Sequence, residues 1–325
     1  MRAATIASLP ATTFALVDLP EPAPAEDELV LAVEACGICG TDLHILEGRS
    51  YAPELPFVLG HEPVGRVIGT GASATGWLGI RVAITLFTGC GTCSWCVAGD
   101  ERLCADLVSI TGVLARPGGF AERLVVAAAQ AVAVPAGLDS AAAAALVDAG
   151  ATAANAVRRT PLDTEARVVL GGGPVGFLVA ELLGASGRAP IVVEPNDRRR
   201  AALAALGHDV SATTADLKRP DVVVDCAGDP AATAWALDAL EPRGTLVVVG
   251  YGRVPQFDSA PIARKELAVV GVRSGSRVDL ERALALAAEG AIAVPEISRF
   301  GLAEIYAAFA ALRAGAIAGK AVIVP

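Results

Sequence analysis

The sequence has few basic residues and no long uninterrupted apolar run. Its 26 lysine and arginine residues stand against 35 aspartate and glutamate residues, which gives a formal net charge of −9. Binding to nucleic acid or to an anionic membrane needs a basic surface, so this balance argues against both partners. The most apolar stretch, residues 120–146, is broken by charged residues, glycine and proline, and is therefore not expected to span a membrane.

Signals for export and for disorder are also lacking. Residues 1–10 carry one arginine and end in Pro10, which is too short and too interrupted for a signal peptide. Apolar residues make up 54% of the chain and charged residues 19%, a composition that excludes a disordered protein. We therefore expect a soluble, cytoplasmic protein of 325 residues, long enough for two domains.

The pattern of secondary structure changes near residue 150. Before it, short β-like runs alternate with clusters of glycine, proline and cysteine, which predicts an irregular β-rich domain; the runs are residues 29–33, 65–68, 81–84 and 121–126. After it, strands alternate with helices; the expected strands are 167–170, 191–193, 221–225, 244–249 and 267–272, with helices at 175–185 and 197–206. This alternation predicts an α/β, doubly wound parallel sheet, after which a further helix is expected at 279–289.

Four of the seven cysteines, Cys90, Cys93, Cys96 and Cys104, fall within fifteen residues with the spacing C-x2-C-x2-C-x7-C. Four thiolates complete a tetrahedral shell around zinc with no open position, which predicts a structural zinc site. Free surface thiols or an iron–sulfur cluster are the alternatives. Of the remaining cysteines, Cys36 and Cys226 are expected to be small buried apolar residues.

A second metal site is indicated by Cys39 and His44 in one run and by His61 and Glu62 in another. The chain has only three histidines, and two of them lie in these runs. A catalytic zinc needs three protein ligands and one labile position, and Cys39 and His61 form the best pair of ligands. On composition alone His44 is also a candidate ligand. The alternative is a buried cysteine with two histidines in the core.

A glycine-rich turn follows the expected strand at 167–170 and opens an apolar helix. Gly171, Gly173 and Gly176 form the pattern G-x-G-x-x-G, which in this context predicts that the pyrophosphate of a dinucleotide binds at the helix N-terminus. Glu194 ends the next strand, where an acid binds ribose hydroxyls and repels a 2′-phosphate. NAD is therefore favoured over NADP, although the arginines at 198–200 also lie close by in the sequence.

Taken together, these motifs and the closing Gly319-Lys320-Ala321-Val322 resemble the zinc-containing alcohol dehydrogenases of the medium-chain dehydrogenase/reductase family, over nearly the whole chain. The resemblance implies a GroES-like, zinc-binding catalytic domain (residues 1–150 and 276–325) and a Rossmann domain (residues 151–275). It also implies two Zn2+ ions per chain, NAD as cofactor, and a homodimer or homotetramer.

The resemblance further assigns roles to single residues. Cys39 and His61 would bind the catalytic zinc, with Asp42 orienting His61, and Glu62 would lie beside the metal and join it transiently. Thr41 would bond the substrate hydroxyl and begin a proton relay towards His44. The remaining positions would contact the cofactor: Pro174 and Val175 in the glycine-rich turn, Arg199 near the adenosine ribose, and Lys320 at the pyrophosphate.

The third zinc ligand departs from the commonest family pattern. Asp148 stands where many relatives have cysteine, and a carboxylate can also bind zinc. This set resembles the bacterial secondary-alcohol branch. The alternative for Asp148 is a helix-surface or cap residue.

The substrate pocket is less well indicated by the sequence. Phe87, Tyr51 and Phe57 are candidates for its walls, and each could equally be a core residue. The expected reaction transfers a hydride between a secondary alcohol and NAD+, or from NADH to a ketone or aldehyde. A polyol, sugar or secondary-metabolite tailoring dehydrogenase is the first alternative, and a non-catalytic nucleotide-binding relative is the second.

Overall fold

The computed structural model describes residues 1–161, 163–250 and 258–325. The chain forms two compact units. The first comprises Met1–Asp148, Ser276–Glu289 and Glu296–Pro325, and the second comprises Ala149–Gly275 and Gly290–Pro295. Both ends of the chain therefore belong to the first unit.

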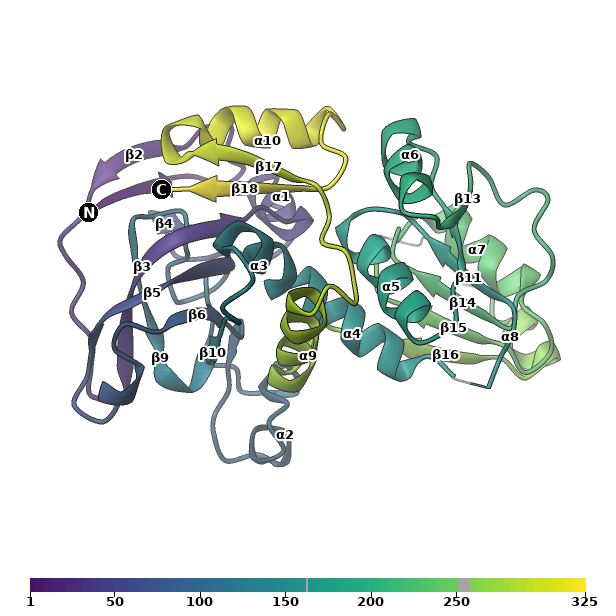
Figure 1. Ribbon diagram of the computed structural model, residues 1–325, viewed down its shortest axis with the longest axis horizontal. Helices are drawn as coiled ribbons and strands as arrows, with labels where there is room; N and C mark the ends of the chain where they lie inside the picture. The colour runs from purple at the N-terminus through teal and green to yellow at the C-terminus, as the bar shows by residue number, and fades with distance from the viewer. Residues whose placement is uncertain (162, 251–257) are drawn as a thin grey trace. The chain divides into compact units, whose positions relative to one another are not determined.

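The first unit is built on sheets that are antiparallel except for the parallel pair β17 and β18 (Figure 1). Its seven-stranded sheet has the order β10-β6-β5-β3-β18-β17, and β9 also pairs with β3. These strands are β3 (Glu28–Gly37), β5 (Glu62–Thr70), β6 (Arg81–Ile84), β9 (Arg123–Ala127), β10 (Ala131–Ala133), β17 (Ile297–Gly301) and β18 (Lys320–Val324). Two smaller sheets consist of β1 (Arg2–Ile6), β2 (Ala15–Asp18) and β4 (Phe57–Val58), and of β7 (Phe87–Thr88) and β8 (Ser109–Ile110).

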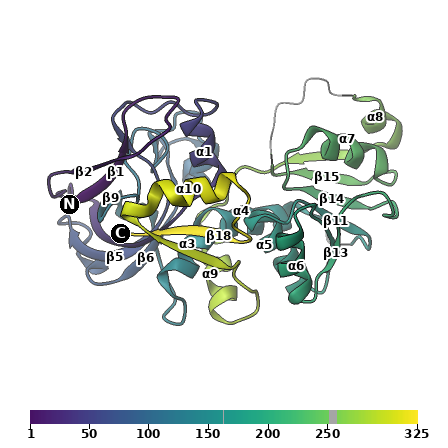
Figure 2. The same cartoon turned by 90° about the horizontal axis from the view of Figure 1, so that it is seen from above.

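Five α-helices of the first unit are described: α1 (Gly40–Leu46), α2 (Ser94–Val97), α3 (Ser140–Val147), α9 (Arg277–Ala288) and α10 (Ile305–Arg313). Short 3-10 turns lie at Thr75–Trp77, Glu101–Leu103, Ala128–Gln130 and Leu302–Glu304. In α3 the alanines and the closing Leu146 and Val147 are buried, because small side chains let this helix pack closely on β3, β5 and β18. Helix α10 packs on β17 and β18 (Figure 2).

The core of the first unit includes three aromatic rings from distant parts of the sequence. Phe120 is fully buried and meets Phe309 of α10 edge to face, with ring centroids 5.9 Å apart. Phe14 contacts both of these rings, with centroid distances of 5.0 Å to Phe309 and 6.5 Å to Phe120. Edge-to-face pairs of this kind add to the free energy gained from burial alone.

Pairing around the end of β3 brings three parts of the sequence together. Gly37, the last residue of β3, pairs with Glu62, the first residue of β5. On its other side, Gly37 pairs with Val322 of β18. Residues at the C-terminal end of β3 and at the starts of β5 and β18 are therefore neighbours, and it is here that the site described below is built.

The second unit is a parallel six-stranded sheet in the order β13-β12-β11-β14-β15-β16. The strands are β11 (Arg167–Leu170), β12 (Ile191–Val193), β13 (Asp209–Ser211), β14 (Val222–Asp225), β15 (Thr245–Val248) and β16 (Ala268–Gly271). Counted from β11, this is the 3-2-1-4-5-6 order of a Rossmann fold, in which ligands bind where the strand order reverses. That point lies between β11 and β14.

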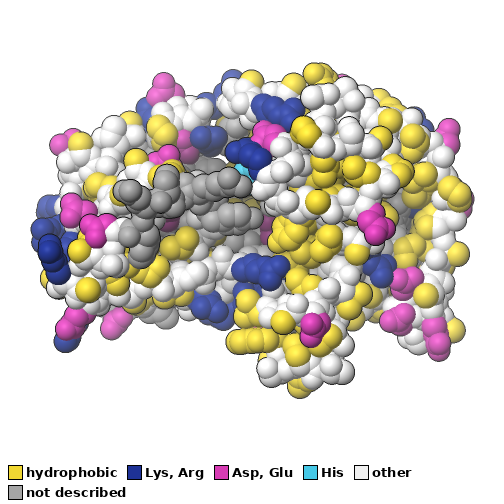
Figure 3. Space-filling model, turned by 180° about the vertical axis from the view of Figure 1, so that it is seen from behind, with side chains coloured by type: hydrophobic (Ala, Val, Ile, Leu, Met, Phe, Trp, Pro, Cys, Tyr) yellow, Lys and Arg dark blue, Asp and Glu magenta, His cyan; other side chains and the backbone are white. Residues whose placement is uncertain are grey.

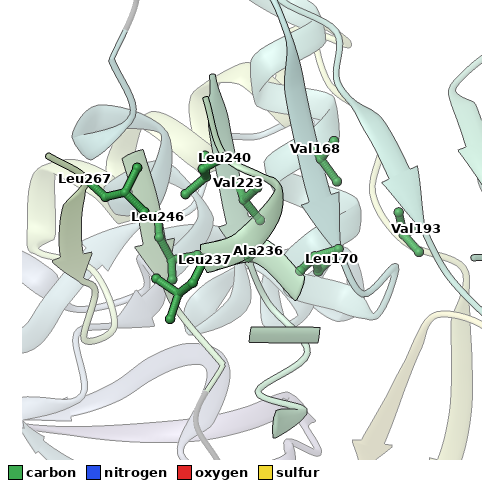
Figure 4. Packing of buried hydrophobic residues seen from close by; sticks show 9 residues of the cluster. All are labelled: Val168, Leu170, Val193, Val223, Ala236, Leu237, Leu240, Leu246 and Leu267. Carbon is green, nitrogen blue, oxygen red and sulfur yellow. The ribbon is translucent and has the colours of Figure 1, made fainter. Parts of the chain in front are cut away.

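Helices α4 (Ala149–Arg159), α5 (Pro174–Ala185), α6 (Asp197–Ala205), α7 (Pro230–Ala239) and α8 (Ala260–Lys265) complete the described part of the second unit. Its core joins the sheet to α7 (Figure 4). The cluster comprises Val168, Leu170, Val193, Val223, Ala236, Leu237, Leu240, Leu246 and Leu267. Continuous apolar strands such as Val222–Val224 are typical of a parallel sheet that is covered on both faces.

The predicted fold class is confirmed, and three strands, β6, β11 and β12, have the predicted bounds. Strands β13 and β17 were not predicted, because both are short and carry polar or glycine residues that weaken the apolar pattern. In the described parts of the chain, no helix combines the length and the apolar character that crossing a membrane requires.

Candidate active site

Four side chains of the first unit converge at the end of β3. Cys39, His61, Glu62 and Asp148 each offer a ligand atom, and these atoms all lie within 4.8 Å of one another. The Cys39 Sγ lies 3.9 Å from Asp148 Oδ2, and His61 Nε2 is also 3.9 Å from that oxygen. The sequence-predicted ligands Cys39, His61 and Asp148 are thus brought together, with Glu62 among them.

Local folding explains how each ligand reaches this point. Cys39 follows β3 and is the N-cap residue of α1, and His61 directly precedes β5. Asp148 follows α3 as its C-cap residue. It is therefore both a cap residue and a member of the cluster. A side chain at Gly37 would push Glu62 out of its place, since an added Cβ would lie 2.0 Å from Glu62 Oε2.

Asp42 connects two of the ligands. It is fully buried in the first turn of α1, and its Oδ2 accepts a hydrogen bond of 2.9 Å from the backbone N–H of Cys39. Its Oδ1 lies 3.3 Å from His61 Nδ1. A carboxylate at this nitrogen fixes the orientation of the imidazole and leaves Nε2 to bind a metal.

The cluster has the properties expected of a zinc site. With Nδ1 of His61 facing Asp42, the buried polar atoms left without a hydrogen-bond partner among the described residues include Nε2 of His61 and Oε2 of Glu62. Such atoms are costly unless another group satisfies them. Bonds of about 2.0–2.3 Å around a tetrahedral zinc place neighbouring ligand atoms roughly 3.3–3.8 Å apart, close to the separations found here. Thiolate, imidazole and carboxylate are also the donors that zinc prefers.

Burial and charge alter the proton affinities of this cluster. Burial opposes the charged form of His61, but the carboxylate of Asp42 and the neighbouring Cys39 outweigh it, and the pKa of His61 lies well above its usual value. Burial raises the pKa of Glu62, although Lys320 opposes this shift. Because the imidazole of His61 holds its proton more tightly than usual without a metal, metal binding must displace this proton, and binding should become tighter as the pH rises.

Lys320 occupies a position that the sequence did not predict. Its Nζ lies 2.6 Å from Glu62 Oε1, and the two side chains are only 3% and 0% exposed. Burial alone would lower the pKa of Lys320, but the charge of Glu62 outweighs it and the pKa is raised. In this structure the ammonium is thus a partner of Glu62, and the contact with pyrophosphate stays a prediction.

Thr41 and His44 lie on α1, the short helix that begins directly after Cys39. The Thr41 hydroxyl oxygen is 3.9 Å from Cys39 Sγ, and His44 follows one turn later in α1. Both side chains are partly exposed, whereas Asp42 between them is buried. This arrangement suits a hydroxyl beside a metal and an imidazole one helical turn further along.

The four-cysteine lobe forms the second cluster. The ligand sulfurs of Cys90, Cys93, Cys96 and Cys104 all lie within 4.8 Å of one another, and all are free thiols. Backbone N–H groups of Cys90 and Cys93 donate hydrogen bonds of 3.4 Å to neighbouring sulfurs. Hydrogen bonds from Thr92, followed by that from the Cys93 N–H, lower the pKa of Cys90 to about 6. The lobe carries exposed apolar side chains, among them Trp95 and Val97. Hydrophobic side chains gather at several places on the face that Figure 3 shows.

Replacing Cys96 with serine is expected to remove one zinc equivalent per chain and to lower the free energy of unfolding by several kcal/mol, because metal binding to such a lobe stabilises its fold. Metal analysis and thermal denaturation measure the two effects. Cys226→Ser is the matched control and should keep its zinc. Unchanged zinc content in Cys96→Ser, or iron in the wild-type protein, would contradict a structural zinc site.

The second unit contains a cavity of about 560 Å³ above the ends of β11, β12 and β14. Gly171, Gly173, Glu194 and Arg199 line it, as the predicted cofactor role requires. Gly171 has a φ of +89°, and a Cβ on Gly176 would lie 1.8 Å from the Gly171 carbonyl oxygen, so both positions need glycine. Pro174, Val175 and Gly176 form the first turn of α5, whose N-terminal N–H groups are suited to bind phosphate.

Glu194 is held firmly at the edge of this cavity. Its Oε2 accepts a hydrogen bond of 2.8 Å from Gly172 N–H, and its Oε1 accepts one of the same length from Asn196 N–H. Arg199 donates to Oε1 at 3.0 Å. Although burial would raise the pKa of Glu194, these donors lower it, so the residue is a carboxylate at neutral pH.

Several cavity residues were not recognised in the sequence. They are Thr213, Thr214, Asp229 and Trp235, which lie in loops and a helix and not in the glycine-rich motif. Asp229 carried a recognisable signal, since it precedes Pro230 and caps α7. Cys226, which was expected to be a small buried residue, is of intermediate exposure and lines the cavity. Cys36 is buried as expected.

The predicted substrate-pocket residues differ in their surroundings. Phe57 is 6% exposed and belongs to the core, which was the alternative for this residue. Phe87 and Tyr51 are partly exposed and remain candidates for a pocket wall.

Comparison with known proteins gives a consistent result. The alcohol dehydrogenase GroES-like domain family matches residues 25–136, and the zinc-binding dehydrogenase family matches residues 174–289. The chain is 31% identical to a sorbitol dehydrogenase of Halalkalibacterium halodurans, over 84% of each chain. It is 29% identical to an alcohol dehydrogenase of Geobacillus stearothermophilus, over 94% of each.

A solved structure is similar along the whole chain. The cobalt- and zinc-bound thermostable alcohol dehydrogenase from Pyrobaculum aerophilum has a TM-score of 0.90 and 26% identity, covering 100% of this chain and 99% of that one. The chain therefore belongs to the zinc-containing alcohol dehydrogenase family of medium-chain dehydrogenases/reductases.

Proposed function

We propose that this protein is a zinc- and NAD-dependent dehydrogenase that oxidises an alcohol, with a secondary alcohol as the expected substrate, and that in reverse reduces a ketone or aldehyde. The observation that carries the proposal is the convergence of Cys39, His61, Asp148 and Glu62 on one point. The Pyrobaculum relative is described as zinc-bound, which supports the same metal here.

The bound groups and the chain divide the chemistry between them. Zinc would lower the pKa of a hydroxyl or polarise a carbonyl, and NAD+ would accept the hydride. Cys39, His61 and Asp148 would hold the metal, and Asp42 orients His61 towards it. The Thr41 hydroxyl accepts the proton of the substrate hydroxyl and passes it towards His44, whose imidazole can release it to water. Glu194 and the glycine-rich turn would hold the dinucleotide.

A substrate panel tests the reaction. Purified protein with two zinc ions per chain should form NADH, followed by absorbance, with secondary alcohols more readily than with primary alcohols. Polyols belong in the panel, because the Halalkalibacterium relative is a sorbitol dehydrogenase. Turnover of polyols alone would favour the polyol alternative, and no turnover with any alcohol or carbonyl would reject the proposal.

Replacing Thr41 with alanine is expected to lower kcat by about a hundredfold, because proton transfer by a positioned group contributes on this scale. Zinc content should stay unchanged. Thr41→Ser retains the hydroxyl and is the matched control, which should keep most of the activity. A Thr41→Ala enzyme with wild-type turnover would remove this residue from the proton relay.

A further inference from the structure

The ion pair between Lys320 and Glu62 lies inside the group of metal ligands. Lys320 is the first residue of β18 and Glu62 is the first residue of β5, and the two strands flank the end of β3. The Nζ–Oε1 distance is 2.6 Å, and neither side chain is exposed by more than 3%. Glu62 at the same time belongs to the four-residue group whose ligand atoms lie within 4.8 Å of one another.

Two groups therefore compete for one carboxylate. If Glu62 bound zinc together with Cys39, His61 and Asp148, four protein ligands would close the tetrahedral shell. Closed shells are found at structural zinc sites, whereas catalytic zinc keeps a position for water or substrate. The lysine ammonium is the other cation within reach of Glu62, and the carboxylate cannot satisfy both equally.

Charge determines whether Glu62 pairs with Lys320 or binds the metal. A buried carboxylate that loses its counter-ion is strongly destabilised until it finds another one. With Lys320 present, Glu62 has a partner at hydrogen-bond distance and has no need of the metal. Without Lys320, a bound metal dication would become the nearest source of positive charge, and Glu62 would move to it.

We propose that Lys320 is a positioning residue that holds Glu62 away from the metal and so keeps the fourth coordination position open. This inference rests on the proposed function, since it assumes that a metal binds to Cys39, His61 and Asp148. It gives Lys320 a role in the metal site that is independent of any contact with the cofactor.

The test uses Co2+ in place of zinc, in the full chain and without dinucleotide, so that a contact between Lys320 and pyrophosphate cannot affect the result. Imidazole is added as a small metal ligand, and the difference in the visible spectrum of Co2+ is recorded. The four-cysteine lobe is a closed shell and contributes nothing to this difference. The rate of metal loss to EDTA is measured on the same samples.

Wild-type protein should show an imidazole-dependent spectral change. In Lys320→Met this change should disappear, and metal loss should slow by at least about tenfold, because changes around metal ligands alter affinity on that scale. Lys320→Arg keeps the positive charge and should behave as wild type. Lys218→Met removes an exposed lysine from the second unit and serves as the matched control for charge.

The double variant Lys320→Met/Glu62→Gln connects the effect to Glu62. It replaces the buried pair with two neutral side chains, and its response to imidazole and its rate of metal loss should both return to wild-type values. If Lys320→Met responds to imidazole as the wild type does, the proposal is overturned. Should Lys320→Met fail to fold, the double variant provides the test. If it loses metal at least about tenfold faster than the wild type, Glu62 is a permanent metal ligand, and the proposal is overturned as well.

Failure of the proposed function would look different. In that case wild-type protein would take up Co2+ only in the lobe, and no variant of Lys320 or Glu62 would change its spectrum.

Discussion

Replacing Asp148 with alanine is expected to remove one of two zinc ions per chain and to lower kcat/KM by at least about a thousandfold. A metal ion contributes several kcal/mol to the stabilisation of the transition state, and about 1.4 kcal/mol corresponds to a tenfold change in rate. The reason is geometric. Asp148 Oδ2 lies 3.9 Å from both Cys39 Sγ and His61 Nε2, so alanine leaves a thiolate and an imidazole with only Glu62 nearby. Metal analysis and NADH formation measure the two effects.

Two further variants separate loss of the ligand from loss of the helix cap. Asp148→Cys supplies a thiolate at the same position and should keep two zinc ions. Asp139→Asn alters the other end of α3, where Asp139 accepts hydrogen bonds from the N–H groups of Ala141 and Ala142. This variant should keep both metals and activity. Retention of both zinc ions by Asp148→Ala would show that this carboxylate is not a ligand.

The fold could be predicted largely because its signals are local. The strand Arg167–Leu170, the glycine-rich turn and the helix after it are adjacent in the sequence, and their apolar pattern identifies a βα unit directly. The family resemblance is confirmed by the matching domain families. Strands β13 and β17 escaped prediction because pairing with long-range neighbours, and not their own residues, stabilises them.

The difference between local signals and long-range pairing also explains which parts of the site could be predicted. Cys39 and His61 lie in short motifs and could be named as ligands from the sequence, and Asp148 could be proposed from its position in the family pattern. The contact between Lys320 and Glu62 spans 258 residues and depends on β18 pairing beside the end of β3. No local pattern predicts such a register, so Lys320 was assigned to pyrophosphate from its motif alone.

Asp42 shows how a single residue links fold and chemistry. Its carboxylate completes the N-terminus of α1 through Cys39 N–H and lies beside the imidazole of His61. The helix start and the ligand geometry therefore depend on the same side chain. Because the residue is fully buried, a change there would disturb stability and metal binding together.

Replacing Glu194 with glutamine is expected to change the ratio of kcat/KM for NAD to that for NADP by about 10²–10³-fold in favour of NADP. Charge-assisted hydrogen bonds from the ribose hydroxyls of NAD to the carboxylate would contribute roughly 1.5–3 kcal/mol, and the variant also removes the repulsion of a 2′-phosphate. Glutamine keeps an acceptor for one of the backbone N–H groups that Glu194 now binds. It also releases Arg199, whose guanidinium pairs with the carboxylate and lines the cavity. Steady-state kinetics with both dinucleotides measure the change.

The double variant Glu194→Gln/Arg199→Met shows which group then accepts the phosphate. If Arg199 binds it, the double variant should lose the gained activity with NADP while resembling Glu194→Gln with NAD. Arg199→Met alone should still prefer NAD, because Gly172 and Asn196 continue to hold the carboxylate in place. An unchanged preference in Glu194→Gln would mean that this residue serves the structure of the turn and does not select the dinucleotide.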